Sequence, residues 1–126
     1  MAKILIVEDE RSVRQALRFE FEDEGYEVLY ATDYPEAVSA FNAFDCDMVI
    51  SDLFLSQGDG IQFLNMVSND KKHVPFIAIT AFPETKLALK AKLLLKDRFF
   101  VKPFYTRAIK DKVNEILKSG SAPNAA

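Results

Sequence analysis

The chain has 126 residues, a net charge of −3, one histidine and one cysteine. This length fits a single domain, and one cysteine with one histidine can form neither an internal disulfide nor a closed structural zinc site. The acidic balance argues against a grip on nucleic acid, and no apolar segment approaches the roughly 20 residues that span a membrane. We therefore expect a cytoplasmic domain that contacts neither nucleic acid nor membrane.

Five apolar runs of strand length recur along the chain, separated by stretches with helical spacing. Runs that are apolar on both faces are typical of strands covered by helices on both sides of a parallel sheet. The predicted strands are Ile4–Val7, Tyr26–Ala31, Met48–Ser51, Phe76–Thr80 and Phe99–Val101.

The stretches between these runs repeat apolar residues every three or four positions, which predicts one helix after each strand. The first helix covers Arg11–Glu24 and is followed by Gly25, a residue suited to a helix C-cap. The second helix begins after Asp33, which is a predicted N-cap, and the third follows Asp59-Gly60.

The fourth predicted helix opens at Pro83-Glu84, and the fifth begins at either Tyr105 or Thr106. Five alternating strands and helices predict one doubly wound α/β domain around a parallel five-stranded sheet. This domain covers residues 1–118. Residues 119–126 are small and polar, so we expect a disordered tail or a remnant of cloning there.

Polar side chains stand at the ends of four predicted strands. Glu8 and Asp9 follow the first strand, Asp52 the third and Lys102 the fifth, while Thr80 ends the fourth. In a parallel sheet these ends share one edge, where open α/β sheets bind their ligands. Clustered carboxylates suit a hard cation such as Mg2+, and an ammonium and a hydroxyl group suit phosphate oxygens. The set predicts phosphoryl transfer onto Asp52 as the nucleophile.

Four motifs at these strand ends together resemble the receiver domain of two-component response regulators. They are Val7-Glu8-Asp9-Glu10, Ser51-Asp52-Leu53-Phe54-Leu55 with Asp59-Gly60, Ile79-Thr80-Ala81 and Val101-Lys102-Pro103-Phe104. The resemblance covers roughly residues 3–118 and implies a flavodoxin-like (βα)5 fold with strand order 2-1-3-4-5. It also implies that Asp52 accepts a phosphoryl group from a phosphohistidine of a partner histidine kinase or histidine phosphotransfer protein. Such a domain is not an enzyme on other substrates and catalyses only its own phosphorylation and dephosphorylation.

The resemblance also implies a metal-binding role for several of these residues. Asp9 and Asp52 would bind Mg2+ directly, together with the backbone carbonyl of Phe54. Glu8 would act mainly through water. The lone histidine, His73, lies outside every motif, so the phosphoryl donor must be another protein or a small molecule.

A conformational switch is implied by the same resemblance. Thr80 and Lys102 would hold the phosphate, and Thr80 would move toward it while Phe99 turns inward. This motion would repack the face made by the fourth helix, the fifth strand and the fifth helix for an unknown effector protein. The Lys102-Pro103 peptide bond is expected to be cis, as X–Pro bonds allow.

Two bulky side chains depart from what the phosphorylation chemistry alone requires. Phe54 lies two residues past Asp52, and Phe82 lies two residues past Thr80. In the family these two positions tune the lifetime of the phosphate. We hypothesise that the two rings hinder the attacking water and slow autodephosphorylation.

Other functions and contacts remain open at this stage. One alternative is an inactive receiver that serves as a docking scaffold. Another is a flavodoxin-like ligand-binding module, although no glycine-rich phosphate loop follows the first strand. Leu89 and Leu93 fall outside the apolar face of the fourth helix, so they either form a homodimer contact or pack at the margin of the core.

Overall fold

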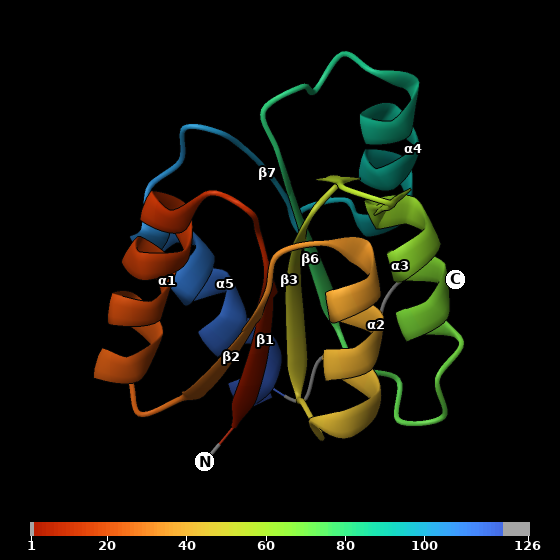
Figure 1. Ribbon diagram of the computed structural model, residues 1–126. Helices are drawn as coiled ribbons and strands as arrows, with labels where there is room; N and C mark the ends of the chain where they lie inside the picture. Colours follow the sequence, from red (N-terminus) through yellow and green to blue (C-terminus); the bar gives the residue numbers. More distant parts are fainter. Residues whose placement is uncertain (1, 120–126) are drawn as a thin grey trace.

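Alternating strands and helices wind around one central sheet in the computed structural model, which describes residues 2–119 (Figure 1). The elements in chain order are β1 (Lys3–Val7), α1 (Arg11–Asp23), β2 (Glu27–Ala31), α2 (Tyr34–Ala43), β3 (Met48–Asp52), β4 (Phe54–Leu55), β5 (Gly58–Asp59), α3 (Gly60–Ser68), β6 (Phe76–Thr80), α4 (Lys86–Leu95), β7 (Phe99–Val101) and α5 (Thr106–Ser119). Ser119 thus ends the last helix, and the rest of the predicted tail lies outside the described residues. Among residues 2–119, no helix has both the length and the hydropathy needed to cross a membrane.

The large sheet is parallel throughout and has the order β2-β1-β3-β6-β7. Counted over its own five strands, this is the predicted order 2-1-3-4-5, so the doubly wound prediction is confirmed. Helices α1 and α5 cover one face of the sheet, and α2, α3 and α4 cover the other (Figure 1). The order reverses between β1 and β3, which is where open α/β sheets bind their ligands.

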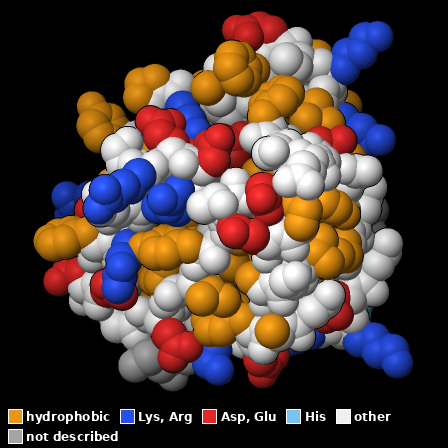
Figure 2. Space-filling view, in the orientation of Figure 1, with side chains coloured by type: hydrophobic (Ala, Val, Ile, Leu, Met, Phe, Trp, Pro, Cys, Tyr) orange, Lys and Arg blue, Asp and Glu red, His pale blue; other side chains and the backbone are white. Residues whose placement is uncertain are grey.

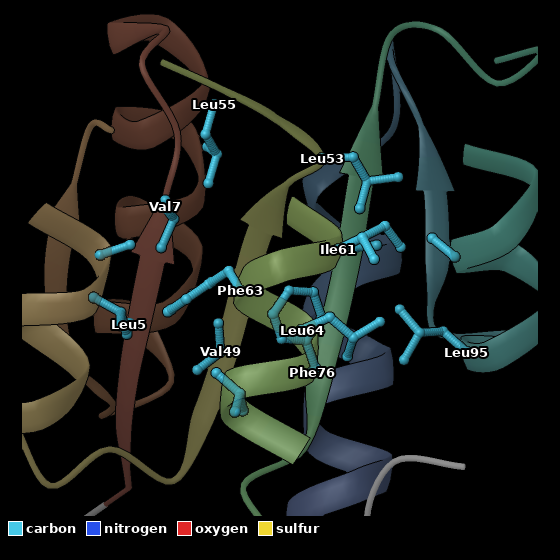
Figure 3. Close-up of a cluster of buried hydrophobic side chains, with 14 of the residues drawn as sticks. Leu5, Val7, Val49, Leu53, Leu55, Ile61, Phe63, Leu64, Phe76 and Leu95 are labelled. Carbon is cyan, nitrogen blue, oxygen red and sulfur yellow. The ribbon is translucent and has the colours of Figure 1, made fainter. Parts of the chain in front are cut away.

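Two hydrophobic cores sit on the two faces of the sheet because successive side chains of a strand point to opposite sides. Leu5 and Val49 belong to the core under α2, α3 and α4, where they meet Phe63 and Phe76 (Figure 3). Ile4, with the neighbouring alternate residues of the sheet, belongs to the core under α1 and α5. Strands β1, β3 and β6 therefore form a rigid base for the residues at their carboxyl ends.

Helix starts follow local capping, and one of them corrects a prediction. The carboxylate of Asp33 accepts a hydrogen bond from Glu36 N, and Asp59 makes a reciprocal capping box at α3. Helix α4 does not open at Pro83-Glu84 as predicted. It begins at Lys86, because Thr85 Oγ1 accepts a hydrogen bond from Ala88 N and makes Thr85 the N-cap. The open choice for α5 resolves to Thr106.

A short antiparallel hairpin, β4–β5, follows the end of β3 and had no counterpart among the predicted elements. Gly60 lets the chain return closely: a Cβ atom at this position would lie 2.5 Å from Leu53 Cα. Gly60 N also donates a 2.8 Å hydrogen bond to Leu53 O. The hairpin thereby holds the segment after Asp52 against the end of the sheet.

Candidate functional site

The residues singled out at the strand ends lie together at the carboxyl edge of the sheet. Glu8, Asp9 and Asp52 each contribute a carboxylate oxygen to a group whose atoms all lie within 4.8 Å of one another. Glu8 and Asp52 are buried, and Asp9 is exposed. In Figure 2, acidic side chains gather over this end of the strands. The topology alone brings together residues that are more than 40 positions apart in the sequence.

Lys102 directly follows β7 and supplies the cation of the cluster. Its Nζ donates a 2.9 Å hydrogen bond to Asp52 Oδ2 and another to Glu8 Oε1, while Glu10 Oε1 lies 3.6 Å away on the rim. The Lys102-Pro103 peptide bond is cis, as predicted. The backbone N of Lys102 also donates to Thr80 O at 2.8 Å, which ties this segment to β6.

Glu8 carries the most perturbed carboxyl group of the site. Its pKa is raised to about 8: burial is the largest cause and the neighbouring Asp52 adds to it, while the hydrogen bond from Lys102 acts in the opposite direction. Glu8 Oε2 is buried without a hydrogen-bond partner in the described part of the chain. For Lys102, burial alone would lower the pKa, but its hydrogen bonds to Glu8 and Asp52 raise it overall. The three carboxylates are therefore only partly balanced by Lys102, and a further cation would stabilise them.

Asp52 is held in place by the turn that follows it. Its Oδ1 accepts a 2.9 Å hydrogen bond from Phe54 N, and Ser51 Oγ donates to its backbone carbonyl at 2.9 Å. Phe54 begins β4, and this hydrogen bond places its backbone N beside Asp52. The Asp52 carboxylate is thus fixed by the backbone on one oxygen and by an ammonium group on the other.

The predicted switch residues lie on the two neighbouring strands β6 and β7. Thr80 is buried, and its Oγ1 accepts a 3.0 Å hydrogen bond from Phe82 N. Phe99 is half-buried and packs against the core that includes α4. The rings of Phe54 and Phe82 meet edge to face, with centroids 5.3 Å apart at 87°. The two bulky residues therefore touch each other across the loops that border the site.

One residue near the site was missed at the sequence level. Arg14, on the first turn of α1, donates through Nη1 to the backbone carbonyls of both Glu8 (3.0 Å) and Asp9 (2.9 Å). A hollow of about 440 Å³ opens beside the same loop and is lined by Val13, Lys102 and neighbouring residues of α1 and of the loop before α5. Every residue has a backbone carbonyl, so the residue types of the loop do not predict this contact. The only available signal was an arginine shortly after the acidic pair.

Comparison with known proteins agrees with this geometry. The family model for the response regulator receiver domain matches residues 4–114. The alkaline phosphatase synthesis transcriptional regulatory protein PhoP of Bacillus subtilis is 31% identical over 116 residues, which cover 92% of this chain and 48% of PhoP. The response regulator SaeR of Staphylococcus aureus is 30% identical over 117 residues, covering 93% of this chain and 51% of SaeR. The chain thus spans about half the length of these curated relatives.

Solved structures give the same answer. The chemotaxis response regulator CheY4 of Vibrio cholerae has a TM-score of 0.77 and 30% identity, covering 93% of this chain and 99% of that chain. The response regulator TrrA of Thermotoga maritima, solved in complex with Mg(2+)-BeF, has a TM-score of 0.77 and 31% identity, covering 93% of this chain and 100% of that chain. The chain therefore belongs to the receiver domain family of two-component response regulators, which are signalling modules rather than conventional enzymes.

Proposed function

We propose that Asp52 accepts a phosphoryl group from a phosphohistidine of a partner histidine kinase or histidine phosphotransfer protein. The observation that carries this proposal is the cluster of three carboxylates within 4.8 Å, held against the single ammonium of Lys102. In the reaction an Asp52 oxygen attacks phosphorus, a P–O bond forms and the P–N bond breaks. The imidazole leaves with the bonding electron pair and takes up a proton.

Mg2+ fits the donor set and would supply the positive charge that the site lacks. Asp9, Asp52 and the carbonyl of Phe54 are proposed as its ligands, with Glu8 acting mainly through water. The all-oxygen set and the unpartnered buried Glu8 Oε2 support this assignment. The relative TrrA was solved with Mg2+ and a beryllofluoride group, which agrees with such a site.

Lys102 and Thr80 are proposed to hold the transferred group. Lys102 Nζ already donates to Asp52 Oδ2, so a small motion brings it to a phosphate oxygen. The Thr80 hydroxyl stands at the end of the neighbouring strand and can donate to another. The hollow beside Lys102 and Val13 offers the donor protein an approach to the site.

Signal output is proposed to pass through the face made by α4, β7 and α5. When Thr80 is drawn toward the phosphate, Phe99 turns inward, and this face repacks for an effector protein. PhoP, which is about twice as long as this chain, is a transcriptional regulatory protein, so an output of that kind is one candidate for the whole protein. A cytoplasmic location suits such a pathway and the free thiol of Cys46.

Helix α4 also offers a surface for self-association. Leu89 and Leu93 are 51% and 80% exposed, and they line one hollow with Lys92 and Lys96. We propose that a phosphorylated copy dimerises through these leucines. Because α4 has several lysines and no acidic residue, two copies of it repel each other, and salt should strengthen the contact by screening this repulsion. An acidic effector is attracted to the same lysines, so salt should weaken its binding.

The experiment that tests the proposed function is phosphorylation by a small donor. The protein is incubated with acetyl phosphate and Mg2+, and the intact mass is measured, with Asp52→Asn as the matched control. A gain of one phosphoryl group that needs Mg2+ and is lost in Asp52→Asn supports the proposal. No gain, or an equal gain in Asp52→Asn, contradicts it.

A further inference from the structure

We infer that Arg14 is a positioning residue for the acidic site: it fixes the loop that carries Glu8 and Asp9 and thereby sets the affinity for Mg2+. This inference rests on the proposed function only in taking Mg2+ as the ion bound there. Within residues 2–119, the side-chain donors of Arg14 reach backbone carbonyls of this loop and not its carboxylate oxygens. Arg14 acts on the backbone beneath them, from the first turn of α1.

The contact joins two successive peptide groups. A single guanidinium nitrogen, Arg14 Nη1, lies 3.0 Å from Glu8 O and 2.9 Å from Asp9 O. Because each peptide group is planar, holding two successive carbonyls fixes the backbone orientation of Asp9 between them. Fixing the backbone in turn fixes the directions of the Cα–Cβ bonds that carry the two carboxylates. Arg14 therefore sets the geometry of two of the three acidic residues at once.

Further contacts make Arg14 the main tie on the helix side of this loop. On the sheet side, Glu8 N donates to Ala31 O at 3.0 Å. On the helix side, the N-cap residue Glu10 makes no side-chain capping hydrogen bond, and Arg14 N donates to Glu10 O at 3.1 Å. No capping side chain therefore ties Glu10 to the helix, and the side chain of Arg14 links α1 to the carbonyls of the loop instead.

The sign of the effect separates positioning from simple charge. Asp9 is exposed, so a loop released from Arg14 must be ordered again whenever the ion binds, and this ordering weakens binding. Residues that orient metal ligands in this indirect way typically contribute 10–100-fold in metal affinity, and we expect about ten-fold for a half-buried contact to the backbone. A guanidinium acting only through its positive charge would have the opposite effect, since its removal would tighten binding of a cation.

The test measures Mg2+ affinity directly, without any phosphorylation. Amide chemical shifts of 15N-labelled protein are followed during titration with Mg2+ alone. Arg14→Met keeps the apolar stem and removes the donors, and Arg14→Lys restores a donor. The matched control is Arg18→Met, which removes the same charge one turn further along α1, where Arg18 pairs with Glu22 at 3.0 Å. We expect Arg14→Met to raise the dissociation constant about ten-fold, Arg14→Lys to recover part of the loss and Arg18→Met to stay within about two-fold of the wild type.

Unfolding in Mg2+-free buffer separates positioning from loss of structure. The urea concentration at the midpoint of unfolding should be similar for Arg14→Met and Arg18→Met. If the midpoint of Arg14→Met is far lower, the Mg2+ dissociation constant of Arg14→Lys decides the outcome. Unchanged affinity, tighter binding or an equal weakening in Arg18→Met would overturn the inference alone. If the wild type binds no Mg2+, the metal part of the proposed function and the inference both fail.

Discussion

Replacing Lys102 by methionine tests whether one ammonium group balances the buried acidic cluster. Its Nζ lies 2.9 Å from Asp52 Oδ2 and also contacts Glu8, whose side chains are 9% and 0% exposed. At an effective dielectric constant near 20, one such contact contributes about 6 kcal/mol of Coulomb energy. Desolvation of the charges offsets about half of this, so we expect Lys102→Met to lower the free energy of unfolding by about 3 kcal/mol at pH 8.

The assay is urea unfolding followed by far-ultraviolet circular dichroism, because the chain has no tryptophan. Lys112→Met is the matched control: Lys112 pairs with Asp97 and Glu115, whose side chains are 73% and 61% exposed. Such exposed pairs contribute below about 1 kcal/mol. Excess Mg2+ should restore part of the stability of Lys102→Met, since it replaces the missing positive charge, and should add no such recovery in Lys112→Met.

The pH dependence of the loss has a definite sign. The pKa of Glu8 is raised to about 8, so its neutral form favours the folded state; this contribution is present at low pH and is lost as the pH rises through about 8. The loss caused by Lys102→Met should therefore shrink toward pH 5, and adding Glu8→Gln should recover part of it at pH 8. A loss no larger than that of Lys112→Met, and unchanged by pH or by Glu8→Gln, would refute the reasoning.

Three further predictions concern other parts of the molecule. Replacing Phe54 and Phe82 together by serine should speed loss of phosphate about ten-fold, which equals about 1.4 kcal/mol off the barrier; an unchanged rate of phosphate release, measured by intact mass, would contradict the role of the paired rings. Burial raises the pKa of the Cys46 thiol to about 11. Its alkylation by iodoacetamide at pH 8 should thus be at least about 100-fold slower in folded than in urea-unfolded protein, and equal rates would show the thiol to be accessible. Sedimentation with beryllofluoride and Mg2+ should show a dimer that Leu93→Asp abolishes, and a monomer at all salt concentrations would remove the proposed contact.

Much of the fold could be predicted from hydrophobic periodicity because the strands of the large sheet are short, apolar and well separated. The strand order came from the family resemblance, since periodicity does not say which strands are neighbours. The predicted start of α4 was wrong because Pro83-Glu84 is a good opening on composition, yet Thr85 Oγ1 accepts a hydrogen bond from Ala88 N, three residues further on, and makes Thr85 the N-cap. The hairpin β4–β5 was missed because strands of two residues are too short to show a period.

The charged residues of the site could be predicted from the ends of the strands, but the contacts that position those residues could not. Asp52 and Lys102 both follow strands of the predicted parallel sheet, so the sequence pattern was enough to place them at the same edge of the sheet. Arg14 contacts backbone carbonyls, which every residue has, so the residue types at positions 8 and 9 do not indicate this contact. Likewise, only the positions of the surrounding donors show that Glu8 Oε2 has no hydrogen-bond partner among the described residues.

The uneven burial of the sheet has a consequence for motion. All five residues of β3 and of β6 are buried, whereas in β7 Phe99 and Phe100 are half-buried and Val101 is 41% exposed. Local opening costs least where the fewest apolar groups are sheltered, so amide hydrogen exchange should be slowest in β3 and fastest in β7. We therefore expect the strand that leads to Lys102 to open at a smaller free-energy cost than the strand that carries Asp52.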